Sequence, residues 1–383
     1  MMRFLHSADW QISRMYSRFD AGDAQELTNA REEGVRRIAK LATEHKVDAV
    51  LVAGDVFDSQ TPRDKTIERL FDATRGFDGP WLMLPGNHDA ALAESVWERA
   101  KRLRLVPQNV HLCLQPELVE VTGKSGTKCA VLPAPLVQRH THTDLTEWFD
   151  AAETPDGAIR IGLAHGSVEG LLAEDIDSQN PIAGDRAARA RLDYLALGDW
   201  HGMKQIDART WYSGTHEPER FRGNEPGYVL LVEIDAPGSI PRVTPVKCGK
   251  YAWKKLALEV QGEADVDSAL RDLASIDGSV VADISLTGVC DLASQERLQA
   301  AVEAAERRAA ASAVRDNDLR ILPSEADLQA LRGDGFVGAA LEQLKDQLHG
   351  SEPELARDAL LQLARIQRER GPSAASAAQG AAA

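Results

Sequence analysis

The sequence predicts an α/β layered domain at the N-terminus, followed by a small α+β module and a helical C-terminal segment. Three observations lead to this prediction. Short apolar runs bounded by turn residues recur along roughly the first 235 residues. A stretch with helical periodicity lies between the first two runs, and such alternation is typical of sheets covered by helices. Ala236-Pro237-Gly238 and Pro241 then interrupt the pattern, as turn residues do at a domain boundary.

Six apolar runs are the expected strands of the first domain, residues 1–238. They are short and contain β-branched or aromatic residues, which is typical of strands buried in a sheet. The runs are Phe4–Ser7, Ala49–Ala53, Trp81–Leu84, Ile159–Ala164, Tyr194–Leu197 and Tyr228–Ile234. A helix is expected over Ala24–Glu44 because apolar residues recur there at helical spacing, namely Val35, Ile38, Ala39, Leu41 and Ala42.

The module expected at residues 245–325 alternates strands with helices. Its order is strand Leu256–Val260, helix Val266–Ala274, strand Val280–Leu286 and helix Ala293–Ala311. Residues 326–370 are rich in leucine and are expected to form helices, which either build a small core of their own or lie in a partner's groove. The tail, residues 371–383, is rich in Ala, Ser and Gly and is expected to be disordered.

Composition argues against several classes of protein. No apolar run approaches the roughly 20 residues that a membrane span needs, and the first residues turn polar too soon for a signal peptide, so we expect a cytoplasmic protein. The four cysteines contain no CxxC pair, which argues against disulfides and a zinc–thiolate site. The net charge of −15 argues against nucleic-acid binding through overall charge, although a local basic track or bound metal ions would supply positive charge.

Five short polar motifs follow apolar strands at the point where each strand ends. They are Asp9-Trp10-Gln11, Gly54-Asp55-Val56-Phe57-Asp58, Gly86-Asn87-His88-Asp89, His165-Gly166 and Gly198-Asp199-Trp200-His201. Strand carboxyl ends are where α/β sheets build their sites, so we expect these side chains to converge. Asp, Asn and His without Cys suit Mn²⁺, Fe or Zn²⁺. Asp55 is the natural carboxylate to bridge two divalent cations about 3.5–4 Å apart, so the motifs predict a two-metal site.

The motifs, in this order, resemble those of the calcineurin-like metallophosphoesterases. Three of them are similar to motifs of the SbcD-type DNA repair exonucleases, namely His6-Ser7-Ala8-Asp9, Gly54-Asp55-Val56-Phe57-Asp58 and Leu84-Pro85-Gly86-Asn87-His88-Asp89. The resemblance covers roughly residues 1–235. It implies a calcineurin-like four-layer α/β/β/α sandwich, and it implies that residues 245–325 form a capping domain that helps to position DNA.

The resemblance also implies a role for each motif residue. The ligands that it implies are Asp9, Gln11, Asp55 and His201 for one metal ion and Asp55, Asn87, His165 and Asp199 for the other. His88 would be the general acid or would stabilise developing charge, and Asp89 would orient it. Gln11 and Asp199 stand where the family usually has histidine. We expect a retained but retuned site, in which Asp199 favours a harder ion such as Mn²⁺.

The implied reaction is hydrolysis of a phosphodiester by metal-activated water. It would belong to a DNA exonuclease or endonuclease that acts in DNA repair with an SbcC-like ATPase of the SMC family, and proteins of this type usually form homodimers. Two alternatives stay open. The same metals act on nucleotides or other small phosphoesters, or Gln11 and Asp199 mark a non-catalytic scaffold. The residues beyond the first domain favour DNA, since superfamily members that act on small molecules often consist of the catalytic domain alone.

Some acidic and histidine residues near the motifs have a structural explanation. Asp58 is expected to cap the following helix, or to support the site from behind, rather than to bind a metal. Asp89 has a similar alternative, because a helix is expected over Ala90–Arg102. His6 lies inside a strand and is expected to pack rather than to bind a metal.

Other residues outside the ligand set also have two explanations. Trp10 and Trp200 are expected to pack as core or wall residues rather than to stack on bases. Arg139-His140-Thr141-His142 has His-x-His spacing, but no strand precedes it, so a solvated loop is expected. Arg220 and Arg222 follow the last motif closely and are candidates for contact with a DNA backbone.

Overall fold

The chain divides into two units. The computed structural model describes residues 1–170, 180–221, 223–322, 324, 327 and 335–369. The first unit, Met1–Trp253, is termed the N-terminal unit, and the second, Lys254–Ala383, is termed the C-terminal unit. The boundary predicted at residues 238–245 lies inside the N-terminal unit, because the chain there connects two antiparallel strands of one sheet.

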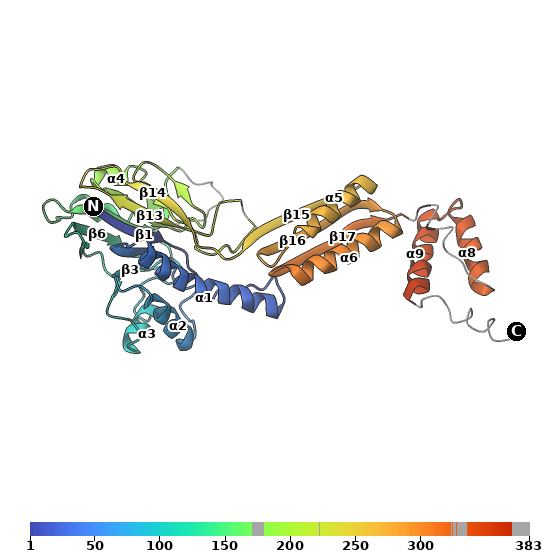
Figure 1. Cartoon of the computed structure of the whole chain (residues 1–383), viewed down its shortest axis with the longest axis horizontal. Coiled ribbons are helices and arrows are strands. Elements are labelled where there is room, and N and C mark those ends of the chain that lie inside the picture. Colours follow the sequence, from blue (N-terminus) through green and yellow to red (C-terminus); the bar gives the residue numbers. More distant parts are fainter. Residues whose placement is uncertain (171–179, 222, 323, 325–326, 328–334, 370–383) are drawn as a thin grey trace. The chain divides into compact units, whose positions relative to one another are not determined.

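Two six-stranded sheets form the centre of the N-terminal unit in the described part of the chain (Figure 1). Sheet A has the order β14 (Arg242–Lys247), β13 (Tyr228–Ile234), β1 (Met2–Ser7), β2 (Ala49–Ala53), β3 (Trp81–Leu84) and β4 (Val110–Leu112). Sheet B has the order β11 (Lys204–Gln205), β12 (Thr210–Tyr212), β10 (Tyr194–Gly198), β7 (Ile159–His165), β6 (Lys128–Ala134) and β5 (Val119–Thr122). A short ribbon pairs β8 (Ser167–Val168) with β9 (Pro181–Ile182). The strands β1 to β4 are parallel, as are β6, β7, β10 and β12.

The central strands are apolar on both faces because both faces are buried. Along β2, Ala49, Leu51 and Ala53 belong to the core between the two sheets, whereas Val50 and Val52 belong to the core beneath the helices. Side chains alternate between the faces of a strand, so a strand covered on both sides requires a continuous apolar run. This requirement explains why the predicted runs coincide with β2, β3 and β13 residue for residue.

Helices cover the outer face of each sheet. The helices α1 (Ala21–Glu44), α2 (Asp64–Thr74) and α3 (Val96–Arg102) share a core with sheet A. The short helices η1 (Glu147–Asp150) and α4 (Arg186–Arg189) share a core with sheet B. In Figure 1, α1, α2 and α3 lie on one side of the sheets and α4 lies on the other. The layers therefore follow the predicted order α/β/β/α.

The prediction of a helix over Ala90–Arg102 is wrong for the first half of this range. The helix α3 begins after Ser95, whose hydroxyl caps it by accepting a backbone hydrogen bond. Asp89 therefore caps no helix. Asp58 caps none either, because α2 begins six residues later, after an N-cap that makes no side-chain hydrogen bond. Both carboxylates are left for other contacts, which are described below.

A three-stranded sheet and two helices form the first part of the C-terminal unit. The elements in chain order are β15 (Ala252–Val260), α5 (Glu263–Ala274), β16 (Val280–Cys290), α6 (Leu292–Arg308) and β17 (Ala311–Ile321). The four elements predicted for this α+β module are present. The sequence gives little sign of β17, because Arg315-Asp316-Asn317-Asp318 interrupts its apolar residues.

Two further helices, α8 (Phe336–Gln347) and α9 (Pro353–Glu369), pack against each other. Leu341 and Leu360 are buried, whereas Phe336 and Leu355 are exposed. Residues 326, 328–334 and 370 of the predicted helical segment lie outside the described residues, as does the predicted disordered tail, residues 371–383. Among the described helices, none has the length together with the apolar composition that a bilayer crossing requires.

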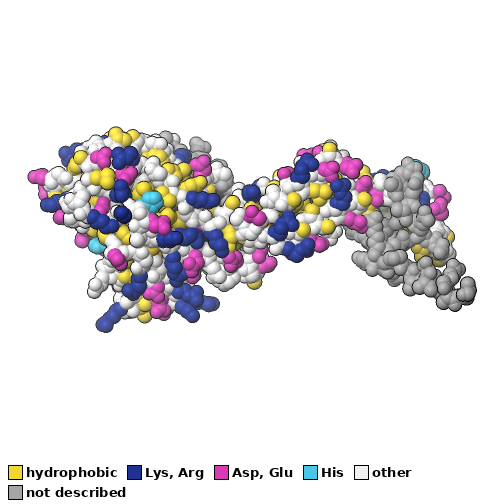
Figure 2. All heavy atoms as spheres, in the orientation of Figure 1, with side chains coloured by type: hydrophobic (Ala, Val, Ile, Leu, Met, Phe, Trp, Pro, Cys, Tyr) yellow, Lys and Arg dark blue, Asp and Glu magenta, His cyan; other side chains and the backbone are white. Residues whose placement is uncertain are grey.

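Basic side chains are unevenly distributed on this acidic chain. Figure 2 shows Lys and Arg side chains gathered over the part of the N-terminal unit where α2 and α3 lie. Exposed basic residues of these two helices include Lys65, Arg69, Lys101 and Arg102. Exposed acidic residues, Asp64, Glu68 and Asp72, lie on α2 as well, so this part of the surface carries charges of both signs.

Candidate metal centre

Backbone hydrogen bonds join the loops that follow β1 and β2 and so place the first two motifs side by side. The Asp9 N–H donates to the Gly54 carbonyl at 3.0 Å, and the Gln11 N–H donates to the Asp55 carbonyl at 2.8 Å. Asp199, which follows β10, joins them because its N–H donates to the Asp9 carboxylate at 3.1 Å. Residues from sheet A and sheet B therefore meet at the strand carboxyl ends, as predicted.

The backbone is strained at four of these residues. The angle φ is positive at Asp9 (53°), Gln11 (43°), Asp55 (52°) and Asp199 (104°). Each such residue costs of order 1–3 kcal/mol, and residues of this kind gather at functional sites. The four strained residues therefore lie where the polar side chains converge.

Gly54 makes room for His165. Its φ is +89°, and a Cβ atom there would lie 2.2 Å from Nδ1 of His165. We expect Gly54→Ala to lower the free energy of unfolding by about 3 kcal/mol or more in urea, through backbone strain plus a steric clash. The control is Gly157→Ala, where φ is +70° but no atom lies within 4 Å of the added Cβ. That variant should lose only about 1–2 kcal/mol, and equal losses would contradict the steric argument.

Asp9, Asp55 and His165 form the centre of the site. One ligand atom from each lies within 4.8 Å of the others, and all three side chains are buried. Nε2 of His165 lies 3.7 Å from Oδ1 of Asp55 and 3.8 Å from Oδ1 of Asp199. The same nitrogen lies 3.0 Å from Oδ1 of Asn87. One imidazole nitrogen thus faces three oxygen atoms, and together they make up one of the two predicted ligand sets.

Three histidine rings at this site have Nδ1 engaged by an oxygen atom of the protein. The pairs are His165 with the Ala53 carbonyl (2.8 Å), His201 with Oε1 of Glu219 (2.6 Å) and His88 with the Asp58 carbonyl (2.9 Å). Carbonyl and carboxylate oxygens accept hydrogen bonds, so Nδ1 of each ring carries a proton. Nε2 is then the nitrogen that can serve a metal ion or a substrate, which is how proteins commonly orient metal-binding imidazoles.

Burial and crowding of like charges perturb the acid–base properties of the site. Burial raises the pKa of Asp9 to about 6, and the carboxylates of Asp55 and Asp199 add to the shift. Burial would lower the pKa of His165, but the three neighbouring carboxylates outweigh it and raise that pKa to about 9. Protons therefore compensate for negative charge that is gathered inside the protein. Divalent cations would compensate for it in the same way.

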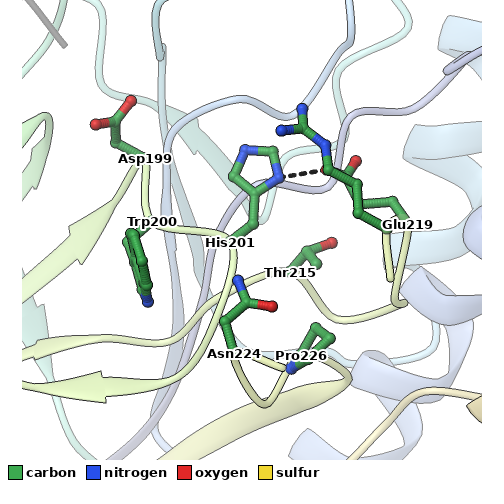
Figure 3. Close-up of a pocket in the computed structure, with 8 residues that line it drawn as sticks. Asp199, Trp200, His201, Thr215, Glu219, Asn224 and Pro226 are labelled. Carbon is green, nitrogen blue, oxygen red and sulfur yellow. Dashed lines mark hydrogen bonds and ion pairs between the residues drawn. The ribbon is translucent and has the colours of Figure 1, made fainter. Parts of the chain in front are cut away.

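Glu219 supports His201 from behind, a role that the sequence motifs do not predict. Its side chain is buried and lies 3.0 Å from Nε of Arg14, 2.9 Å from Nε of Arg220 and 3.7 Å from Arg31. Burial opposes ionisation, but His201 and the arginines outweigh it and hold the pKa of Glu219 well below its ordinary value. Figure 3 shows the His201 ring turned toward Glu219. Glu219 is thus a charged carboxylate that fixes the orientation of this ring.

We expect Glu219→Gln to weaken Mn²⁺ binding about 10–100-fold, because carboxylates that support metal-binding histidines have effects of this size. Glutamine keeps the shape of the side chain but removes the charge beside Nδ1–H of His201. The measurement is a Mn²⁺ titration of the metal-free protein. Glu217→Gln is the matched control, since Glu217 is buried in the same loop but its carboxylate accepts the backbone N–H groups of Lys250 and Tyr251. Equal affinities in the two variants would refute the supporting role.

The two unusual residues of the predicted ligand set both lie at the site. Oδ1 of Asp199 faces His165, and Oδ2 accepts a hydrogen bond from the Ser167 hydroxyl at 3.2 Å. Gln11 is buried, and its Nε2 lies 3.5 Å from Oδ2 of Asp55. Asp199 therefore presents an oxygen atom to the site, whereas Gln11 presents its amide nitrogen.

His88 and Asp89, the predicted catalytic pair, are held by different partners. The Asp89 carboxylate accepts the backbone N–H groups of Gly86 at 2.7 Å and Phe57 at 3.0 Å. Asp89 therefore shapes the turn that carries His88, and its contact is with the backbone. The ring of His88 is oriented by the Asp58 carbonyl instead. This contact makes Asp58 a supporting residue, which is one of the two roles predicted for it.

The residues predicted to pack or to be solvated do so. His6 is buried, and burial lowers its pKa to about 3. Trp10 is buried in the core beside sheet A, and Trp200 packs against the core beside sheet B. His140 and His142 are exposed, as expected of a solvated loop.

Arg220 lies at the site, whereas Arg222 lies outside the described residues. The side chain of Arg220 is 47% exposed and pairs with Glu219. A cavity of about 100 Å³ adjoins it, and its lining includes Asp199, Trp200, His201, Thr215 and Asn224 (Figure 3). Arg220 is therefore placed where a charged group of a ligand could reach it.

Comparisons with known proteins agree with this site. A family model described as calcineurin-like phosphoesterase matches residues 2–232. The SbcD component of the nuclease SbcCD of Rhodobacter capsulatus is 26% identical over 322 residues, which are 71% of this chain and 75% of that protein. The uncharacterized metallophosphoesterase YhaO of Bacillus subtilis is 24% identical over 60% of this chain and 57% of its own length. The DNA double-strand break repair protein Mre11 of Methanosarcina acetivorans is 24% identical over 73% of this chain.

The coverage differs among these relatives. The chain spans three quarters of the Rhodobacter protein but only 45% of the Methanosarcina protein. The family model, in contrast, covers both sheets except for β14 and the last two residues of β13, and it includes every predicted metal ligand. The chain therefore belongs to the calcineurin-like phosphoesterase family.

Proposed function

We propose that the chain is a two-metal phosphodiesterase that cleaves DNA. The observation that carries the proposal is the common orientation of three imidazoles: His165, His201 and His88 each have Nδ1 engaged by an oxygen of the protein. Two of these rings would bind cations through Nε2, and the third would face the substrate. Oxygen donors from Asp9, Asp55 and neighbouring residues complete a site that suits divalent ions.

The donors divide into two sets that share Asp55. One set is Asp55, Asn87, His165 and Asp199, and the other is Asp9, Asp55 and His201. The resemblance adds Gln11 to the second set, but the amide nitrogen of Gln11, and not its oxygen, faces Asp55. Mn²⁺ is the ion that this oxygen-rich set favours, with Fe or Zn²⁺ as alternatives. A bound pair of such cations would lower the pKa of water so that it can act as a nucleophile near neutral pH, and would neutralise charge on the phosphoryl group.

His88 would protonate the leaving oxygen. Its side chain is 28% exposed, and Nε2 lies 4.0 Å from Oδ2 of Asp55, so the ring borders the site and can reach a substrate. Because Nδ1 remains bound to the Asp58 carbonyl, Nε2 is the atom that would transfer the proton. Asp89 would act indirectly, by holding the turn that carries His88.

Three features support DNA as the substrate. The names of two relatives describe a component of a nuclease and a protein of DNA double-strand break repair. A second unit follows the region that the family model matches. Arg220, with 47% of its side chain exposed beside the site, is a candidate to contact a backbone phosphate, as is Arg222.

The wider assignment follows the same resemblance. The first part of the C-terminal unit would position DNA, and α8 with α9 would bind an SbcC-like ATPase of the SMC family. The exposed Phe336 and Leu355 are apolar residues on these helices that a partner could cover. A homodimer and a cytoplasmic location are further parts of the proposal.

The test compares three kinds of substrate with the full chain after metal removal. Labelled single- and double-stranded DNA, bis-p-nitrophenyl phosphate and p-nitrophenyl phosphate are incubated with Mn²⁺ or with EDTA. We expect Mn²⁺-dependent cleavage of DNA and of the diester, and much slower hydrolysis of the monoester. Hydrolysis of the small phosphoesters without cleavage of DNA would overturn the proposal that DNA is the substrate. Binding of metal ions without hydrolysis of any of these substrates would favour the alternative that the chain is a non-catalytic scaffold.

A further inference from the structure

The amide of Gln11 is fixed by two neighbours of opposite charge. Nη1 of Arg14 lies 2.5 Å from Oε1 of Gln11, and Oδ2 of Asp55 lies 3.5 Å from its Nε2. A guanidinium only donates hydrogen bonds, and a carboxylate only accepts them. One orientation of the amide therefore satisfies both neighbours, with the oxygen toward Arg14 and the nitrogen toward Asp55. The atom that could bind a metal ion thus faces away from the bridging carboxylate.

Arg14 is itself held in place. Its Nε lies 3.0 Å from Oε2 of Glu219, and its Nη1 lies 3.3 Å from Oδ1 of Asp58. Its side chain is only 19% exposed. Turning Oε1 of Gln11 toward a cation would break a charge-assisted hydrogen bond, and such bonds are roughly twice as strong as neutral ones. It would also leave the amide nitrogen of Gln11 without its carboxylate partner.

On the opposite side of the site, Oδ1 of Asp55 accepts the His88 N–H at 2.9 Å, and Oδ2 of Asp199 accepts the Ser167 hydroxyl at 3.2 Å. Nε2 of His165 faces oxygen atoms of Asp55, Asp199 and Asn87 at 3.0–3.8 Å. That side offers four donors, two of them carboxylates. The side of Asp9 and His201 offers three donors once Gln11 is excluded, and the Arg14 guanidinium pairs with Glu219, the carboxylate that holds His201. The two positions therefore differ in both the number of donors and the local charge.

We infer that the two cation positions are unequal, because Arg14 holds the amide oxygen of Gln11 and Gln11 therefore binds no metal ion. The inference rests on the proposed two-metal function and adds an order of filling to it. The position formed by Asp55, Asn87, His165 and Asp199 fills first. The position beside Asp9 and His201 fills only at a higher free concentration of Mn²⁺.

The test is a calorimetric titration of the metal-free full chain with Mn²⁺ alone. We expect two binding steps whose dissociation constants differ at least about tenfold, as loss of a single support to a metal ligand typically produces. Gln11→Met keeps the length of the side chain but removes the amide, and it should leave both constants within about threefold of wild type. Gln11→His supplies an imidazole and should tighten the weaker step by about tenfold or more. Thermal melting followed by circular dichroism checks that each variant is folded.

Asp9→Asn is the control for a residue that does bind, and it should weaken the second step by about tenfold or more. A single step with two equal constants would overturn the inference, and so would a Gln11→Met variant that loses as much affinity as Asp9→Asn. These outcomes are separate from those of the proposed function. A wild-type chain that binds no Mn²⁺ would refute the proposed two-metal site as well. If the wild-type chain cleaves DNA but Gln11→Met loses affinity for Mn²⁺, only the present inference about Gln11 is refuted.

Discussion

Asp55→Asn is expected to reduce Mn²⁺-dependent hydrolysis by about 10³-fold or more, equivalent to roughly 4 kcal/mol in the barrier. Asp55 is buried, its Oδ1 accepts the His88 N–H at 2.9 Å, and the same oxygen lies 3.7 Å from His165. Asparagine keeps the shape and one oxygen, but it removes the charge that both cation positions share. Initial rates at saturating Mn²⁺, together with metal content after dialysis, measure the effect.

Asp78→Asn is the matched control for this substitution. Asp78 is exposed and lies away from the motifs, so the same chemical change there should leave the rate unchanged. Thermal melting of both variants separates a loss of catalysis from a loss of folding. If Asp55→Asn kept more than a tenth of the wild-type rate, the bridging role of Asp55 would be wrong.

His88→Ala is expected to lower kcat for DNA cleavage by about 10²–10⁴-fold, the range that general acids contribute. Metal content should stay close to that of wild type, because the ring reaches the site from its border and its Nδ1 is bound to a backbone carbonyl. The loss should be much smaller for bis-p-nitrophenyl phosphate. Nitrophenolate leaves without a proton, whereas the alkoxide of a DNA strand needs one.

The comparison of the two substrates is the decisive part of this experiment. A general acid predicts a large loss on DNA and a small loss on the nitrophenyl diester. Equal losses on both would instead indicate that His88 stabilises charge on the phosphoryl group. His140→Ala serves as the control because His140 is exposed in the solvated loop and should have no effect on either substrate.

Most of the candidate metal site could be predicted from the sequence because parallel strands bring distant residues together in a regular way. Asp9, Asp55, Asn87, His165 and Asp199 each follow an apolar run, and the carboxyl ends of parallel strands meet at one edge of a sheet. The position of such residues depends on a local pattern and one general rule of topology.

The supporting residues could not be predicted, because their roles depend on contacts across the fold. Glu219 lies in the loop between β12 and β13, and Arg14 lies in the loop after β1, so no strand end marks either of them. They meet each other at 3.0 Å although 205 residues separate them in the chain. The only signal of Glu219 in the sequence is its closeness to the last motif.

Neighbours in the sequence are also a poor guide to neighbours in space. Asp89 is predicted to orient His88, the residue next to it, but its carboxylate is used by the backbone of the turn. The strand β17 shows a related effect, since pairing with β16 forms a strand from a sequence with little apolar pattern. In both places, tertiary contacts outweigh the local sequence.

The predicted ligands come from two different sheets, and this has a consequence for the stability of the folded chain. Asp9, Asp55 and Asn87 follow strands of sheet A, and His165 and Asp199 follow strands of sheet B, so each bound ion would cross-link the two halves of the sandwich. Unfolding would then require release of the ions. At a free ion concentration of a hundred times the dissociation constant, each ion adds about 2.7 kcal/mol to the free energy of unfolding. When metal ions are scarce, the protein would therefore be degraded faster by proteases, and it would also lose its activity.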